Sequence, residues 1–262
     1  MSSSLLCMEK KGSTVRRDKR RVLRLIAATA PALLAGGFLA IKVYAGANGR
    51  VPSNVTFSPE TAAAAASGDA FRGMLLARRC AHCHGDEGFS PVAATPNLAG
   101  MDRLTNWKQL QDFRDHKRSS RVMEPIAASL STQDMADVVA YYARLPVFVD
   151  FQDNRAFPQA APSAQQAEVA TRLVSFGDGE RGIPPCQACH GPVAYRPGAP
   201  ALMTQNGDYL LQQLEAFANG GRTNDINESM RVITSLLTES EKQALARYYG
   251  GGLGAGGTMA GK

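Results

Sequence analysis

Cys80-Ala81-His82-Cys83-His84 has the pattern C-x-x-C-H, and Cys186-Gln187-Ala188-Cys189-His190 repeats it. This pattern is the attachment signature of c-type haem. Two thiols about one turn apart can each add to a vinyl group of one porphyrin, and the histidine that follows lies under the ring and binds the iron. We therefore expect two covalent haem c groups, with His84 and His190 as iron ligands and four attachment cysteines: Cys80, Cys83, Cys186 and Cys189.

Three other uses of paired cysteines compete with haem attachment. A thioredoxin-like redox pair has the same C-x-x-C spacing, but it needs a βαβ setting and does not require the following histidine. A zinc site could use both pairs, yet 103 positions separate Cys83 from Cys186, and structural zinc pairs usually lie much closer together. Two structural disulfides are possible outside the cytoplasm, although each would close a strained four-residue loop. Of these interpretations, haem attachment is the one that requires the histidine.

A second iron ligand is expected downstream of each motif. Methionine opposite histidine raises the reduction potential, because a soft thioether favours ferrous iron. Met123 follows His84 by 39 residues and Met230 follows His190 by 40 residues, so we expect these two methionines to be the second axial ligands. The remaining candidates lack matching offsets or lie on expected helices, where methionine is usually core filler: Met74, Met101, Met135 and Met203.

Two histidines lie outside the proposed ligand positions. His82 is a spacer inside the first motif and is expected to point away from the iron. His116 lies in the charged stretch of residues 114–118 and is expected to be a surface residue. An exchange of His116 for Met123 as iron ligand is the alternative that this stretch leaves open.

The second half of the chain repeats the first. Cys80 and Cys186 differ by 106 positions, and Met123 and Met230 differ by 107. Each half is therefore expected to form one haem domain of about a hundred residues. We predict six consecutive parts. The N-terminal parts are a basic segment with a signal peptide or membrane anchor (1–45) and a tether (46–67). They are followed by a first domain (68–146), a linker (147–163), a second domain (164–250) and a flexible glycine-rich tail (251–262).

Helices account for most of both expected domains. Apolar spacing predicts helices over residues 68–79, 104–117, 132–144, 164–176 and 207–219, and a last one ending at Tyr249. Capping boxes beginning at Ser131 and Thr238 open the last helix of each half. Sustained strand alternation is absent from the sequence except for residues 147–151, so we expect an all-α fold. The alanine run of residues 62–66, placed in the tether, could also begin a helix.

The N-terminus has the features of an export signal. Seven lysines and arginines within residues 10–21, and Arg24 after them, precede an uncharged apolar stretch over residues 25–41. Val43-Tyr44-Ala45 could serve as a cleavage site, and residues 22–44 are long enough to remain as a membrane anchor. Both interpretations place the rest of the chain on the periplasmic side of a bacterial inner membrane, either soluble after cleavage or anchored.

The formal net charge of +6 belongs to this N-terminal segment. Residues 1–45 hold nine of the 29 basic residues and two of the 23 acidic ones, which leaves 20 basic and 21 acidic residues in the remainder. That balance offers no case for nucleic-acid binding. Cys7 precedes the apolar stretch, so it is badly placed for lipid attachment and is interpreted as incidental.

Over about residues 68–250 the chain resembles the cytochrome c4 family of two-domain, two-haem cytochromes. The second half carries the closer match, at Pro200-Ala201-Leu202, Tyr209-Leu210, Gln213-Leu214, Phe217, Gly220, Arg222 and Met230. The first half matches at Pro96-Asn97-Leu98-Ala99-Gly100 and Arg121-Val122-Met123. It departs at Met101-Asp102 and His116-Lys117, where that family usually has a glycine-glutamine pair and a glycine-rich turn.

The resemblance implies two tandem cytochrome c domains packed face to face with their haems near each other. It also implies an electron carrier, rather than an enzyme, that works between respiratory complexes or dehydrogenases and a terminal oxidase or reductase. A dedicated cytochrome subunit of a dehydrogenase is the alternative. A two-haem peroxidase is a weaker one, because that chemistry needs an iron with an open position. The expected partners are redox proteins and, through residues 22–44, the inner membrane.

Overall fold

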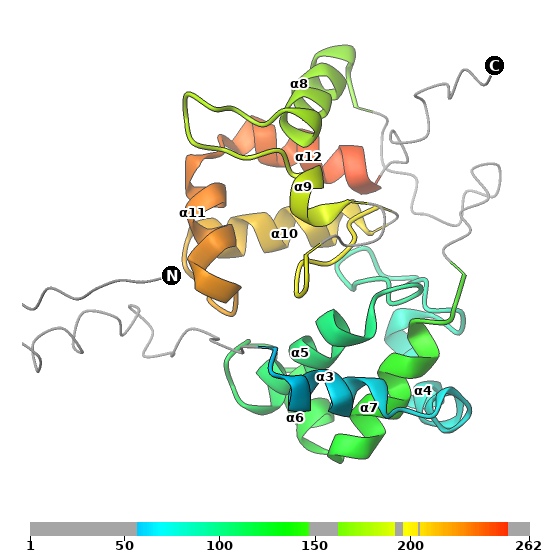
Figure 1. Ribbon diagram of the computed structural model, residues 1–262. Coiled ribbons are helices and arrows are strands. Elements are labelled where there is room, and N and C mark those ends of the chain that lie inside the picture. The colour runs from blue at the N-terminus through cyan, green and yellow to red at the C-terminus, as the bar shows by residue number, and fades with distance from the viewer. Residues whose placement is uncertain (1–56, 147–161, 192–195, 204, 251–262) are drawn as a thin grey trace, which may run out of the picture. The chain divides into compact units, whose positions relative to one another are not determined.

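The computed structural model describes residues 57–146, 162–191, 196–203 and 205–250 (Figure 1). The regular elements of these residues are helices, together with a single β-bridge between Asp178 and Ile183, so the all-α prediction is confirmed. Several predictions lie outside the described residues: the signal or anchor, the start of the tether, most of the linker with its short strand-like run, and the C-terminal tail.

Five helices form the first half: α3 Pro59–Ala66, α4 Ala70–His84, α5 Arg103–Arg114, α6 Met123–Ala128 and α7 Thr132–Tyr142. Asp69 caps α4, because its carboxylate accepts hydrogen bonds from the amides of Phe71 and Arg72. The expected capping box opens α7, where Ser131 and Asp134 bond each other's backbone amides. Helix α4 therefore starts at a defined residue and runs to the end of the first motif.

The second half contains α8 Ala164–Ser175, α9 Gln187–His190, α10 Gly207–Ala218, the 3₁₀ turn η2 Ile226–Glu228, α11 Ser229–Leu236 and α12 Glu239–Gly250. Gly177 and Gly220 follow α8 and α10 with φ values of 71° and 75°, as helix-terminating glycines do. The second capping box also forms, because the amide of Glu241 donates to Thr238 and the amide of Thr238 donates to Glu241.

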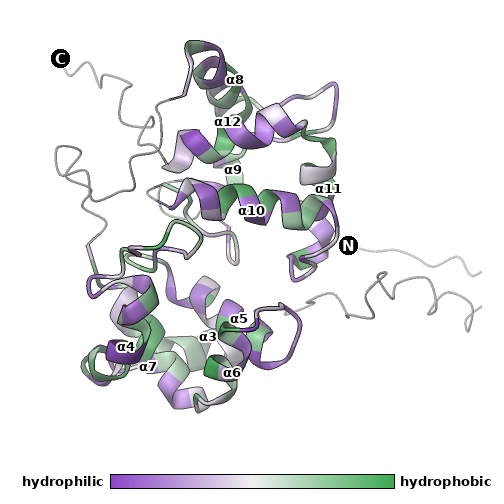
Figure 2. Cartoon of the chain, turned by 180° about the vertical axis from the view of Figure 1, so that it is seen from behind, coloured by the Kyte–Doolittle hydropathy of each residue, from purple (hydrophilic) through white to green (hydrophobic). Residues whose placement is uncertain are grey.

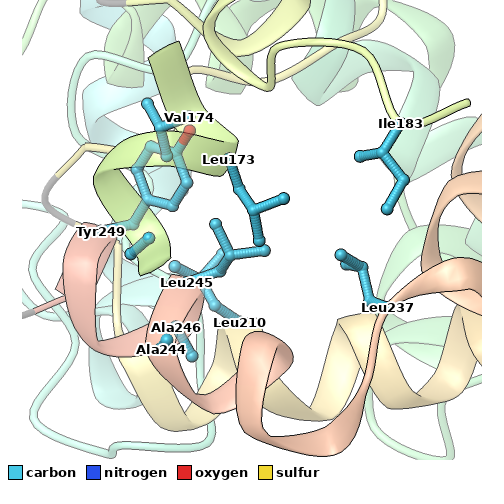
Figure 3. Packing of buried hydrophobic residues seen from close by; sticks show 10 residues of the cluster. Leu173, Val174, Ile183, Leu210, Leu237, Ala244, Leu245, Ala246 and Tyr249 are labelled. Carbon is cyan, nitrogen blue, oxygen red and sulfur yellow. The ribbon is translucent and has the colours of Figure 1, made fainter. Parts of the chain in front are cut away.

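Buried apolar side chains of the described residues form two clusters in the first half, the smaller one around Tyr142, and one cluster in the second half. In the larger cluster of the first half the largest fully buried members are Trp107 and Met135, on α5 and α7. In the second half, side chains of α8, α10 and α12 meet, with Leu173, Leu210 and Leu245 pointing toward one another (Figure 3). Polar and apolar stretches alternate along single helices such as α10 (Figure 2), as expected for helices with one buried face.

A close approach of backbones joins α4 to α7. A Cβ atom added at Gly73 would lie 1.9 Å from the carbonyl oxygen of Asp137, so only glycine fits there. Asp137, which is fully buried, accepts hydrogen bonds from the Asp69 amide at 2.8 Å and from Arg72 Nε at 2.9 Å. These contacts fix the helix that carries the first motif against the last helix of its half.

The structure differs from the predicted elements at several helices, and α5 also ends at Arg114 rather than at residue 117. The alanine run belongs to α3, whose Ala65 is 2% exposed, so the helical alternative to a tether is the one that forms. The helices α6 and α11 were not predicted, because each is only six to eight residues long. Helix α4 is longer than expected and includes the motif. The boundaries of the two domains themselves stay a prediction.

Candidate functional site

The first motif occupies the last turn of α4. This turn places Cys80, Cys83 and His84 on one wall of a cavity of about 480 Å³, and Met123 lies on its wall as well. Apolar side chains supply much of the remaining wall: Leu98, Leu110, Phe113, Val138 and Val139. A cavity of this size and character suits a bound cofactor. Two thiols, an imidazole and a thioether around it are the groups that haem c attachment and iron ligation require.

A proline carbonyl orients the histidine of each motif. His84 Nδ1 lies 2.8 Å from the carbonyl oxygen of Pro96, and His190 Nδ1 lies 2.7 Å from that of Pro200. Burial lowers the pKa of both histidines, although the hydrogen bond opposes it. A neutral ring that donates from Nδ1 leaves the lone pair of Nε2 available for a metal ion. The two halves therefore hold their motif histidines in the same way.

The environment of the first cysteine of each motif differs from that of a redox-active pair. Burial raises the pKa of Cys80, and it raises the pKa of Cys186 to about 11. Both side chains are therefore thiols at neutral pH, whereas thioredoxin-like exchange depends on a lowered thiol pKa. The described residues also hold no cluster of three or more metal-binding side chains of the kind that the zinc alternative requires.

Met123 and Met230 lie in the first turns of the two short helices that were not predicted. Met123 is the first residue of α6, and its amide donates to Ser120 Oγ at 3.1 Å. Met230 is the second residue of α11, beside Arg231, whose amide and Nε donate to the carboxylate of Asp225. Both methionines are therefore held where a short helix starts on an anchored turn.

The other candidate ligands have different surroundings. Met135 is fully buried in the first core, as expected for core filler, and Met74 is 39% exposed. Met101 lines the cavity, but its sequence offset has no match in the second half. His116 lies on the surface, where its Nδ1 is 2.9 Å from Glu124 Oε2 and its side chain is 75% exposed.

Among the cavity residues without a role in the sequence analysis is Arg118, and Arg222 was noted only as part of a resemblance. Both arginines line the cavity, and they are 104 positions apart, as are Phe113 and Phe217. Each guanidinium carbon lies over the phenylalanine ring of its own half, at 4.7 Å for Arg118 and 4.4 Å for Arg222. The shift of 104 positions, shared by the two arginines and the two phenylalanines, is the sequence signal from which this matched pair could have been found.

Residues of the second half complete the first cavity. Tyr209, Gln213 and Arg222 lie on its wall. Arg118 Nη2 donates to Tyr209 Oη at 2.8 Å and to Gln213 Oε1 at 2.9 Å. The Gln205 side chain also bonds the amide and carbonyl of Asn97, at 2.7 and 3.0 Å. The second half therefore supports the loop whose Pro96 carbonyl orients His84.

The cavity opens at an apolar rim. Val122 and Ile126 line the cavity and are also exposed, by 58% and 37%. Both residues are neighbours of Met123 at the start of α6. In the second half Val232 and Leu236, on α11 after Met230, are exposed by 56% and 38%. Each proposed methionine ligand is thus followed or flanked by exposed apolar side chains.

Comparison with known proteins identifies relatives of one kind. The Cytochrome c family description matches residues 72–145. A thiosulfate dehydrogenase electron acceptor of Stutzerimonas stutzeri is 41% identical over 66% of this chain and 78% of its own. The crystal structure of cytochrome c4 from Pseudomonas stutzeri is 30% identical, with a TM-score of 0.62, over 71% of this chain and 99% of that one.

A third similar protein is longer. The structure of thiosulfate dehydrogenase (TsdBA) from Marichromatium purpuratum is 34% identical, with a TM-score of 0.60, over 69% of this chain. This chain covers 39% of that protein, so the similarity concerns one part of it.

Proposed function

The chain belongs to the cytochrome c4 family of two-haem electron-transfer proteins, and on that premise we propose that it carries electrons from a thiosulfate dehydrogenase to a terminal oxidase or reductase. One observation carries the proposal: both halves pair a histidine fixed by a proline carbonyl with a methionine at a matched offset. Two such ligand pairs suit a carrier, because neither iron keeps an open position for a substrate.

The proposed roles rest on the two motifs and the matched methionine offsets and, in the first half, on the cavity that these side chains line. Cys80 and Cys83 would bind one haem c through thioether bonds, and Cys186 and Cys189 would bind the other. His84 and His190 would coordinate iron through Nε2, because Nδ1 faces the proline carbonyl. Met123 and Met230 would supply the second ligand of each iron, and a thioether ligand would favour the ferrous state. Haem iron would supply the one-electron chemistry, and the apolar side chains on the wall of the first cavity would pack against the first haem.

The proposed donor rests on the relatives. One similar protein is a thiosulfate dehydrogenase electron acceptor, and the longer similar structure is a thiosulfate dehydrogenase. The exposed apolar side chains at Val122 and Ile126 give a contact face beside the first cavity. Small, partly apolar contact faces are typical of transient electron-transfer complexes.

The longer relative also favours a second candidate, a dedicated cytochrome subunit of a dehydrogenase. In that protein a region similar to this chain belongs to the same polypeptide as the rest of a thiosulfate dehydrogenase. This candidate uses the same iron ligands. It differs only in that the contact between the chain and the dehydrogenase is permanent. It predicts that the chain copurifies with a dehydrogenase, whereas a carrier is isolated alone.

The proposed compartment is the periplasmic side of the inner membrane, as for related cytochromes c4. The basic and apolar N-terminal residues support export. Within the described ranges no helix is long and apolar enough to cross a bilayer. The proposed signal or anchor, residues 22–44, lies outside those ranges.

The experiment that tests the function combines a haem count with a reduction assay. The full chain, matured in a host that attaches c-type haem, should carry two haems and show methionine ligation to both ferric irons. A thiosulfate dehydrogenase supplied with thiosulfate should then reduce both haems rapidly. A high-spin haem that reacts with peroxide would instead identify an enzyme, and absence of reduction by this donor would remove the proposed partner.

A further inference from the structure

The segment that leads to the proposed methionine ligand is longer in the second half than in the first. Arg118 and Met123 are five positions apart, whereas Arg222 and Met230 are eight positions apart. The two arginines occupy matching places, each over the phenylalanine ring of its own half. The second segment therefore contains three more residues than the first, and it includes the 3₁₀ turn η2, to which no element of the first segment corresponds.

Two successive residues of η2 have a left-handed backbone. Asn227 has a φ of 54° and a ψ of 32°, and Glu228 has a φ of 58° and a ψ of 15°. A residue with a Cβ atom is strained in this region, although asparagine tolerates it better than glutamate does. From Lys117 to Met123, by contrast, no residue is left-handed. Backbone strain therefore lies directly before Met230 and is absent directly before Met123.

The packing around the two methionines differs as well. Met123 packs against the larger buried cluster of the first half, and Ala127 on the same helix is fully buried. In the second half Ile233 of α11 packs against the buried cluster, but Met230 is not among the residues that contact it. The carbonyl of Met230 accepts a hydrogen bond from Thr234 Oγ1 at 2.7 Å. Core packing thus supports the first methionine side chain more than the second.

Polar contacts hold the two ends of η2. Ser229 Oγ donates to the carbonyl of Ile226 at 2.8 Å, and the amide and Nε of Arg231 donate to the carboxylate of Asp225 at 2.9 and 2.8 Å. A strained backbone persists only where the surrounding contacts over-determine it. In the haem-loaded chain the bond from Met230 to iron would be a further contact of this kind. Its loss would let η2 relax, whereas loss of the first methionine would release no such strain.

We propose that Met230 is the exchangeable ligand of the molecule, so that the second iron accepts a small neutral donor in place of the thioether while the first iron stays closed. In the exchange an iron–sulfur bond breaks and an iron–nitrogen or iron–carbon bond forms, with no change of oxidation state and no proton transfer. The exposed apolar side chains of Val232 and Leu236, which follow Met230 on α11, favour an uncharged ligand.

This inference rests on the proposed ligation of both haems by methionine and adds a consequence for electron transfer. Methionine opposite histidine raises the reduction potential. A nitrogen donor in place of Met230 would remove that effect, so the second haem would accept electrons less readily. The second haem is therefore the place at which a bound small molecule would slow the carrier.

The first test titrates the full, ferric, haem-loaded chain with imidazole, at a pH where imidazole is uncharged. The readout is the loss of the charge-transfer band of methionine-ligated ferric haem. Imidazole should bind in two steps, the first at least about tenfold tighter, which corresponds to about 1.4 kcal/mol. Met230→His should abolish the tighter step and Met123→His the weaker one. Two haems of equal affinity, or loss of the tighter step in Met123→His, would overturn the proposal.

The second test changes the strain of η2 and leaves the methionine in place. Glu228→Gly releases the strain of a left-handed residue and should weaken imidazole binding at the second haem by about fivefold. Glu228→Gln is the matched control, because it removes the ion pair with Arg231, whose Nη2 lies 3.6 Å from Glu228 Oε1, and keeps the strain. Asn227→Ala should strengthen binding about threefold, since alanine tolerates this region less well than asparagine.

A control from the first half completes the set. His116 is also left-handed, with a φ of 55°, so His116→Gly relieves similar strain away from η2 and should leave the affinity of the second haem unchanged. Equal affinities of Glu228→Gly and Glu228→Gln would overturn the proposal. If a variant fails to fold, the titration of the wild-type chain still decides.

The reduction assay separates this proposal from the proposed function. Two haems of equal affinity for imidazole would still accept electrons from a thiosulfate dehydrogenase, so the carrier would stand while the exchangeable ligand failed. A chain that this donor does not reduce would lose the proposed function, and its two imidazole affinities would still be measurable.

Discussion

The two halves bring their motif histidines to the same position by different routes. In the first half α4 is one helix of 15 residues that ends with the motif. In the second half α8 stops at Ser175, and the motif lies on the four-residue α9 after an intervening loop. Yet the histidine Nδ1 distances to the proline carbonyls agree within 0.1 Å, at 2.8 and 2.7 Å.

The two halves therefore share the immediate surroundings of the motif histidines. They differ in the contacts that hold each motif against the rest of its half. In the first half Arg72 and Asp137 fix the helix carrying the motif against α7. In the second half Arg181 joins the loop before the motif to Glu241 on α12, at 2.6 Å. Both supports are arginine–carboxylate pairs, but they arise from unrelated positions. The comparison indicates that ligand geometry can be kept while its scaffold changes.

The largest expected effect tests whether both halves use a methionine as the second iron ligand. Met123→His should lower the potential of the first haem by roughly 0.2 V, within the range of about 0.8 V that axial ligands span. Met230→His should do the same for the second haem, as measured by redox titration with optical detection. Met101→Leu is the matched control, because Met101 lines the cavity without a counterpart. A larger shift for Met101→Leu than for Met123→His would identify a different ligand.

The second-largest expected effect compares the stability contributed by the two arginine–carboxylate pairs, one in each half. Asp137→Ala removes a fully buried carboxylate with three hydrogen-bond donors, and it should lower the free energy of unfolding by about 3 kcal/mol. Glu241→Ala should cost only about 1 to 2 kcal/mol, because Arg181 remains 33% exposed and can be hydrated. Denaturant unfolding of the haem-loaded proteins measures both. Equal losses would mean that the supports do not differ in strength.

The same two carboxylates predict a dependence on pH. Arg181 holds the pKa of Glu241 below its usual value; burial raises that of Asp137, but hydrogen bonds from Asp69, Gln133 and Arg72 outweigh burial and lower it. Because both folded-state pKa values lie below the unfolded ones, about 3.9 for Asp and 4.3 for Glu, this stabilisation is present above about pH 5 and is lost on acidification. Unfolding curves of Asp137→Asn and the wild type should therefore converge as the pH falls below 4. Curves that stay parallel would contradict this.

The smallest effect concerns the turn after α5 and α10. His116 has a φ of 55° where the second half has Gly220 with a φ of 75°. Gly220→Ala should cost about 1 kcal/mol from backbone strain alone, because a Cβ there would meet nothing within 4 Å. His116→Gly should gain only a few tenths of a kcal/mol, since it relieves strain but loses the contact with Glu124. Thermal unfolding should therefore show a lower melting temperature for Gly220→Ala and a slightly higher one for His116→Gly, each compared with the wild type.

The sequence predicted the repeated chemistry better than the scaffold. The two motifs and both capping boxes could be read directly, because each depends on residues a few positions apart. The short helices that begin near Met123 and Met230 could not, since helices of six to eight residues carry little periodicity and form through packing. The matched arginines were missed because their role depends on contacts across 104 positions, and surface solvation is the default for a lone arginine.

The loop after the first motif also constrains how the protein is assembled. The carbonyl of Pro96 orients His84, and the next residue, Asn97, is bonded through its backbone to Gln205. Gln205 lies in the second half, 108 positions after Asn97, so these hydrogen bonds form only when both halves are folded. The first histidine is thus in its final setting only once the second half has folded. We therefore expect the first haem site to reach its final geometry only in a chain whose second half is present and folded.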